Sequence, residues 1–179
     1  PTIRQKLKIS PEEEIPIPKL SSIKKIKINN RGLKDLTRLP SLLPNLKNID
    51  LSINAISELD SLVGLDNLER LNLSSNQIQN IQPLSMMSSL LRIELNNNYL
   101  TDIQAMEKMH CLEFLYLNNN AISNLDPISG LIELEVLSLN KNQITNISPL
   151  SKLIELEELN LNTNQITDIS PLSSLSCLK

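Results

Sequence analysis

One asparagine recurs every 22 residues along most of the chain, and this period constrains the fold more than any other feature. The surrounding phrase, Leu-x-x-Leu-x-Leu-x-x-Asn-x-Ile, has its clearest copy between Leu156 and Ile166. A repeat of this length is typical of solenoids, in which each repeat forms one coil. The recurring residues are Asn54, Asn76, Asn98, Asn120, Asn142 and Asn164.

Apolar residues keep the same period. Counted from each asparagine, positions −8, −5, −3, +2, +5, +8 and +11 hold Leu, Ile or Met in all six repeats. The −5 and −3 side chains lie two residues apart, so they leave a short strand on one face while −6, −4 and −2 leave it on the other. One repeat cannot bury so many aliphatic side chains alone. We therefore expect stacked coils that share a continuous core.

The recurring asparagine is expected to be structural. Its amide has donor hydrogens and an acceptor oxygen, which can bond the backbone of its own turn and of the next coil. Position +7 is proline in four of the six repeats, which predicts short 3₁₀ or extended segments on the outer wall instead of long helices. These prolines are Pro83, Pro127, Pro149 and Pro171.

This pattern resembles the leucine-rich repeat family over roughly residues 17–178. The phrases Asn-Gln-Ile-Thr-Asn-Ile-Ser-Pro-Leu at 142–150 and Asn-Gln-Ile-Thr-Asp-Ile-Ser-Pro-Leu at 164–172 are similar to those of internalins of bacterial surfaces. The same 22-residue class includes a regulatory subunit of a protein phosphatase. The resemblance implies an α/β solenoid, a right-handed curved coil with a parallel β-sheet on a concave face that binds another protein.

The period also divides the chain. We expect an N-terminal cap segment over 1–22, a degenerate first repeat over 23–45, six 22-residue repeats over 46–177, and the start of a truncated seventh repeat at 178–179. In the first repeat Arg31 replaces the asparagine, and the 23-residue step to Asn54 places one inserted residue near 40–44.

The coil headed by Asn164 has no successor in the sequence, so its apolar layer is expected to be exposed and open to self-association. That layer is Leu156, Leu159, Leu161, Ile166, Ile169 and Leu172.

Residues typical of catalysis or metal binding are sparse. His110 is the only histidine. Cys111 and Cys177 lie three coils apart, about 14 Å at the usual strand spacing, which exceeds the roughly 7 Å limit for a disulfide. Three of the four methionines occupy core positions. We expect free thiols, no metal site, no cofactor and no enzyme.

Acidic residues recur at position −7, as Glu69, Glu113, Glu135 and Glu157. A row of carboxylates could suggest calcium, but one carboxylate per coil lacks the converging ligands that calcium needs. A solvated acidic rim is the favoured interpretation.

Charge is divided along the chain. Residues 1–38 hold ten Lys or Arg against four acids, while the remainder holds seven against sixteen. The overall net charge of −3 thus hides a dipole that could orient a charged partner. The basic end has no aromatic residue for stacking on bases, so no nucleic acid is expected, and the apolar runs are too short for a membrane span.

Two of the chain's three aromatic residues, Phe114 and Tyr116, stand at positions −6 and −4 of one strand, on the face away from the core. Single exposed apolar residues are normal, but aromatic side chains grouped with arginine are typical of interface hot spots. We predict that the contact centre for a partner protein is Arg70, Arg92, Glu94, Phe114, Tyr116 and Val136.

The predicted function is non-catalytic protein–protein recognition on the concave face, as in internalins. Two alternatives remain open: an intracellular regulatory or scaffold subunit, and the recognition domain of a larger multidomain protein. Free cysteines and the lack of a signal-like start favour the cytoplasm, whereas the resemblance to internalins favours a secreted or cell-surface protein.

Overall fold

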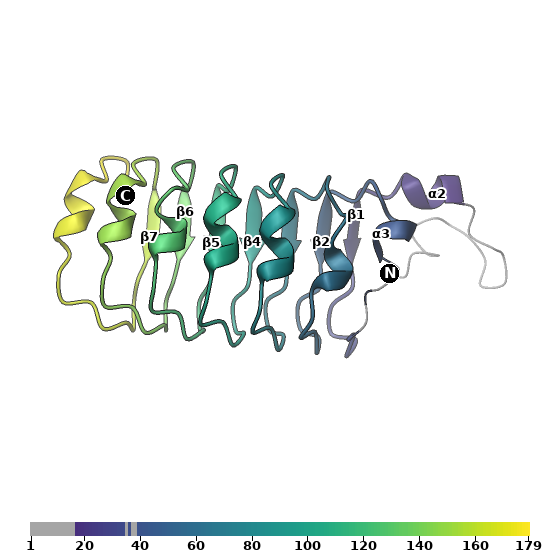
Figure 1. The fold of residues 1–179 in the computed structure, drawn as a ribbon, viewed down its shortest axis with the longest axis horizontal. Helices are drawn as coiled ribbons and strands as arrows, with labels where there is room; N and C mark the ends of the chain where they lie inside the picture. The colour runs from purple at the N-terminus through teal and green to yellow at the C-terminus, as the bar shows by residue number, and fades with distance from the viewer. Residues whose placement is uncertain (1–16, 35, 37–38) are drawn as a thin grey trace.

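The structure is a computed structural model that describes residues 17–34, 36 and 39–179. Seven three-residue strands form one parallel sheet in which the spatial order follows the order in the sequence (Figure 1). The predicted solenoid with a parallel sheet is therefore confirmed. The strands are β1 Lys25–Lys27, β2 Asn48–Asp50, β3 Arg70–Asn72, β4 Arg92–Glu94, β5 Phe114–Tyr116, β6 Val136–Ser138 and β7 Glu158–Asn160.

The strand register follows the repeat. Arg92 of β4 pairs with Phe114 of β5, 22 residues later, and the same offset relates the later neighbours. Between β1 and β2 the offset is 23, since Lys25 pairs with Asn48. The segment between these strands contains the short helix α3, Leu39–Leu42, which includes part of the stretch where the sequence predicts the inserted residue.

The wall opposite the sheet is built from single turns of 3₁₀ helix, as predicted, and the ribbon view shows one such turn beside each strand from β2 onward (Figure 1). Four of the six turns have proline as their second residue, where its fixed φ suits the first turn of a helix and its missing N–H leaves no hydrogen bond unmade. The turns are η1 Asp60–Leu62, η2 Gln82–Met86, η3 Gln104–Lys108, η4 Asp126–Ile128, η5 Ser148–Lys152 and η6 Ser170–Ser174, and α2 at Ile17–Ser21 precedes β1.

The core lies between the two walls and is aliphatic. Every apolar repeat position of the first five repeats is at most 3% exposed. Burying one such leucine or isoleucine contributes roughly 1.5–3 kcal/mol relative to leaving it exposed. Met87, Met106 and Met109 fill core positions, whereas Met86 is 74% exposed.

The last coil is less buried than the others, but the expected open layer is narrower than the sequence predicts. Leu156 is completely buried and belongs to the same core cluster as Leu175, so its predicted exposure is wrong. Ile169 is 70% exposed. The remaining four members, Leu159, Leu161, Ile166 and Leu172, are partly buried against the core.

The recurring asparagines join neighbouring coils through the backbone. The amide of Asn98 donates to the carbonyl of Leu95 in its own turn at 3.1 Å and to that of Leu73 in the preceding coil at 3.0 Å. Its Oδ1 accepts a hydrogen bond from the N–H of Ile78 at 3.0 Å. The bonded neighbour is thus the preceding coil and not the next one, so the predicted direction of the bonds between coils is wrong.

Each coil also turns through one residue in the left-handed region, directly before the recurring asparagine or its counterpart Arg31. The φ angle at these positions lies between 54° and 58°. The residues are Asn30, Ile53, Ser75, Asn97, Asn119, Lys141 and Thr163.

Residues 1–16 of the expected cap segment lie outside the described residues, and the domain division stays a prediction. Cys111 and Cys177 are exposed free thiols, and His110 is exposed. Within the described part of the chain, no helix combines the length and the apolar character that crossing a membrane requires.

Candidate functional site

The strand residues that point away from the core form two parallel rows on what we call the open face of the sheet. This is the face that the sequence analysis takes to be concave. The −6 row is Lys25, Asn48, Arg70, Arg92, Phe114, Val136 and Glu158. The −4 row is Lys27, Asp50, Asn72, Glu94, Tyr116, Ser138 and Asn160.

Aromatic and cationic side chains meet at the middle of the open face. The guanidinium carbon of Arg92 lies 4.6 Å from the ring centre of Tyr116 and 5.6 Å from that of Phe114, within the range of cation–π attraction. Both rings are half-buried, and Val136 stands beside Phe114 on β6. We call these four residues the aromatic cluster.

Glu94 fixes the orientation of Arg92. Its Oε1 accepts a hydrogen bond from Arg92 Nε at 2.8 Å, and its Oε2 accepts one from Asn72 Nδ2 at 3.0 Å. Burial lowers the pKa of Arg92, but the bonds and charge of Glu94, with a smaller contribution from Tyr116, outweigh it and raise that pKa. The guanidinium therefore stays charged.

The structure places five of the six predicted contact residues together, namely Arg92, Glu94, Phe114, Tyr116 and Val136, on β4 to β6. Arg70 lies one strand away on β3, in register with Arg92. Its side chain is exposed and makes no hydrogen bond or ion pair with any residue that the structure describes.

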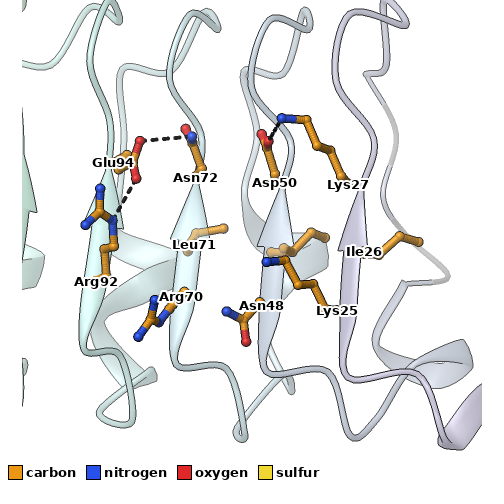
Figure 2. Close-up of a pocket in the computed structure, with 11 residues that line it drawn as sticks. Lys25, Ile26, Lys27, Asn48, Asp50, Arg70, Leu71, Asn72, Arg92 and Glu94 are labelled. Carbon is orange, nitrogen blue, oxygen red and sulfur yellow. Dashed lines mark hydrogen bonds and ion pairs between the residues drawn. The ribbon is translucent and has the colours of Figure 1, made fainter. Parts of the chain in front are cut away.

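Sequence analysis missed the hollow beside the cluster. A depression of about 260 Å³ lies over β1 to β4, and Figure 2 shows side chains of both rows around it. Its lining adds Lys25, Lys27, Asn48, Asp50 and Asn72 to the predicted Arg70, Arg92 and Glu94, with the tops of the buried strand residues as its floor. The signal that could have revealed it is the run of Lys, Asn, Arg and Arg along the −6 row.

Asp50 is held within the hollow. It forms an ion pair with Lys27 at 2.8 Å and accepts a hydrogen bond from the hydroxyl of Ser52 at 2.6 Å. Burial raises its pKa, but the bonds from Lys27 and Ser52 outweigh burial, so the pKa lies below the usual value of 3.8.

Beyond Tyr116 the −4 row is tied into the backbone of the sheet. The Ser138 hydroxyl donates to Oδ1 of Asn118 at 2.8 Å, and the same oxygen accepts the N–H of Asn140 at 2.7 Å. Ser138 is only 9% exposed, so it presents little to a partner. Glu158 and Asn160 of β7 are exposed, so the accessible part of the open face comprises the hollow, the aromatic cluster and the outward residues of β7.

The acidic rim carries ion pairs at two of its four positions. Glu69 pairs with Lys47, and Glu157 pairs with Lys179 at 2.6 Å. Across residues 17–34, 36 and 39–179, no group of three or more His, Cys, Asp or Glu is arranged to hold a metal ion.

Comparison with known proteins identifies the repeat. The family model described as leucine-rich repeats in two copies matches residues 44–86, 88–130 and 132–174. No curated protein matches the chain.

Several solved structures are similar. An internalin (inlF) from Listeria monocytogenes superposes with a TM-score of 0.85 at 30% identity, covering 91% of this chain and 48% of that one. Internalin C2 from the same species gives 0.83 at 28% identity, with 98% and 88% covered. A leucine-rich repeat protein from Leptospira interrogans gives 0.70 at 28% identity, with 75% and 36% covered. The chain spans about half the length of the first internalin. With most of its length matched by the repeat model, the chain belongs to the leucine-rich repeat family, and its coils are similar to those of internalins.

Proposed function

We propose that this protein-interaction module binds a partner protein on the open face of its sheet, and that the aromatic cluster is the centre of the contact. No catalytic step is part of the proposal. In the described residues the single histidine and both cysteines lie outside the open face, and the two carboxylates that line the hollow, Asp50 and Glu94, are engaged in ion pairs with Lys27 and Arg92.

One observation carries the proposal: the two aromatic rings of β5 take no part in the core. The core residue between them, Leu115, and the one after them, Leu117, are completely buried, whereas Phe114 and Tyr116 remain half-exposed. A core built from aliphatic layers has no packing need for these rings. Tyrosine, phenylalanine and arginine are enriched at the centres of protein interfaces.

The arrangement of the cluster also favours binding. The contact of Arg92 with both rings and its bond to Glu94 hold three side chains in one geometry before any partner arrives. A preorganised surface loses less rotamer entropy on association. The cluster can therefore offer a rigid apolar platform with one positive charge at its edge.

The test is to identify the partner by affinity capture and then to measure its affinity for purified variants. The Phe114→Ala, Tyr116→Ala double variant should bind about 30-fold or more weakly, since truncating central aromatic anchors commonly costs about 2 kcal/mol or more. Tyr99→Ala is the matched control, because Tyr99 is the third aromatic residue and is 61% exposed away from the open face. Equal affinity of the double variant and wild type would refute the proposal.

A further inference from the structure

The two rows of the open face differ in how their charges are compensated. In the −4 row both carboxylates are already engaged, Asp50 by Lys27 and Glu94 by Asn72 and Arg92. Lys27 and Arg92 pair with these carboxylates, so the positive charge of Arg70, which also lines the hollow, is a surplus that neither carboxylate offsets.

The surplus lies in the −6 row. Arg70 and Asn48 stand on neighbouring strands, and neither side chain has a hydrogen-bond partner in the part of the chain that the structure describes. Figure 2 shows the Arg70 guanidinium and the Asn48 amide side by side at one edge of the hollow, with Lys25 on the next strand. Arg70 and Asn48 thus place hydrogen-bond donors on neighbouring strands at the same edge of the hollow.

The neighbouring arginine makes this surplus unfavourable for the free chain. Arg70 and Arg92 are direct cross-strand neighbours, and like charges in that relationship repel. Glu94 and the two rings offset the charge of Arg92, but no carboxylate among the described residues pairs with Arg70. An acidic group supplied from outside would remove the repulsion and satisfy both donors.

We infer that the partner protein inserts a carboxylate side chain, Asp or Glu, into the hollow, where it binds Arg70 and Asn48. The planar fork of arginine matches a carboxylate in a two-point contact. Two strand steps separate Arg70 from Phe114, which places the acidic group about 10 Å from the aromatic contact. The inference rests on the proposed function, because it names the chemistry of a partner on the same face.

The test uses a random peptide display library panned on the wild-type chain and, in parallel, on Arg70→Gln. Peptides selected on wild type should be enriched in both an apolar residue and an acidic one. Selection on Arg70→Gln should lose the acidic preference and keep the apolar one. Lys108→Gln, which removes one exposed positive charge from η3 on the opposite wall, is the matched control and should select as wild type does.

A selected peptide then allows a double-mutant cycle. Changing its Glu to Gln should weaken binding to wild type by about tenfold, and by much less to Arg70→Gln, because the two changes remove the same contact. The affinity of the Glu peptide should also fall more steeply with salt than that of the Gln peptide.

The outcomes separate the two claims. Two results overturn the carboxylate inference and leave the proposed function standing. In both, the selected peptides depend on Phe114 and Tyr116. In the first they show no preference for acidic residues, and in the second that preference persists on Arg70→Gln. A phosphoserine peptide that binds more tightly than its Glu counterpart overturns it in favour of a phosphate group. Failure to select any peptide that depends on Phe114 or Tyr116 counts against both.

Discussion

Phe114 and Leu115 are adjacent on β5 and face opposite environments: Phe114 lies under the Arg92 guanidinium on the open face, and Leu115 is completely buried. The short strand separates the residues that hold the coil together from those that a partner can touch. Substitutions at the two positions should therefore affect different properties.

We predict that Leu115→Ala lowers the free energy of unfolding by about 2–5 kcal/mol, because it removes buried methyl groups and leaves a cavity. Phe114→Ala should lower it by about 1 kcal/mol or less, since it removes a half-exposed ring and one cation–π contact. Urea unfolding of both variants beside wild type measures this difference. A Phe114→Ala loss as large as that of Leu115→Ala would contradict the separation.

The recurring asparagines lead to a second prediction. Asn98→Leu removes a side chain that is 6% exposed and bonds Leu73, Ile78 and Leu95 through the backbone. Each backbone group that is left buried without a partner costs about 1–3 kcal/mol. The midpoint of urea unfolding should drop accordingly.

Gln143→Leu is the control for this measurement, because Gln143 is exposed and lies one residue after a recurring asparagine. Its midpoint should stay close to that of wild type. If Asn98→Leu unfolded at the same urea concentration as Gln143→Leu, the bonds across coils would contribute little to stability.

The sequence predicts the architecture well because the period carries it. Apolar positions two apart define the strands, and a frame without slips from Leu46 onward fixes the sheet register. Prolines at +7 predict the short 3₁₀ turns. All three are local patterns that repeat, so each coil supports the interpretation of the others.

The site could be predicted only in part. Position alone predicts that Phe114 and Tyr116 share a face, but the stacking of Arg92 on them depends on rotamers that no period encodes. The charge of the hollow depends on which of several charged neighbours pair: Lys27 pairs with Asp50, and none of the described carboxylates pairs with Arg70. The last coil could not be predicted residue by residue either, since Leu156 is completely buried while Ile169 of the same coil is 70% exposed.

The left-handed position before each recurring asparagine gives a third prediction. Ile53 has φ of 57°, a conformation that is strained for a β-branched residue. Asparagine tolerates this region, as Asn97 and Asn119 do at the equivalent positions. Ile53→Asn should therefore raise the free energy of unfolding by about 1 kcal/mol.

Ile132→Asn is the matched comparison. Ile132 is 52% exposed, close to the 53% of Ile53, and is not among the residues with positive φ. This substitution should bring no gain in stability. A gain of equal size at both positions would mean that removing exposed apolar surface, and not relieving the backbone, explains the effect.

The last prediction concerns pH and Asp50. Burial raises its pKa, but the bonds from Lys27 and Ser52 outweigh burial, so the folded-state pKa lies below 3.8. A carboxylate with a depressed pKa stabilises the fold above its unfolded-state pKa, and this contribution is lost as pH falls through the folded-state value. Wild type should thus be more stable than Asp50→Asn at pH 6, with the difference shrinking below about pH 4. Urea unfolding of both chains at several pH values measures this difference in stability.

The same comparison in a Lys27→Gln background should show a smaller dependence on pH, because the main stabilising partner is absent. A difference between wild type and Asp50→Asn that stays constant or grows on acidification would show that Lys27 and Ser52 do not stabilise the ionised carboxylate.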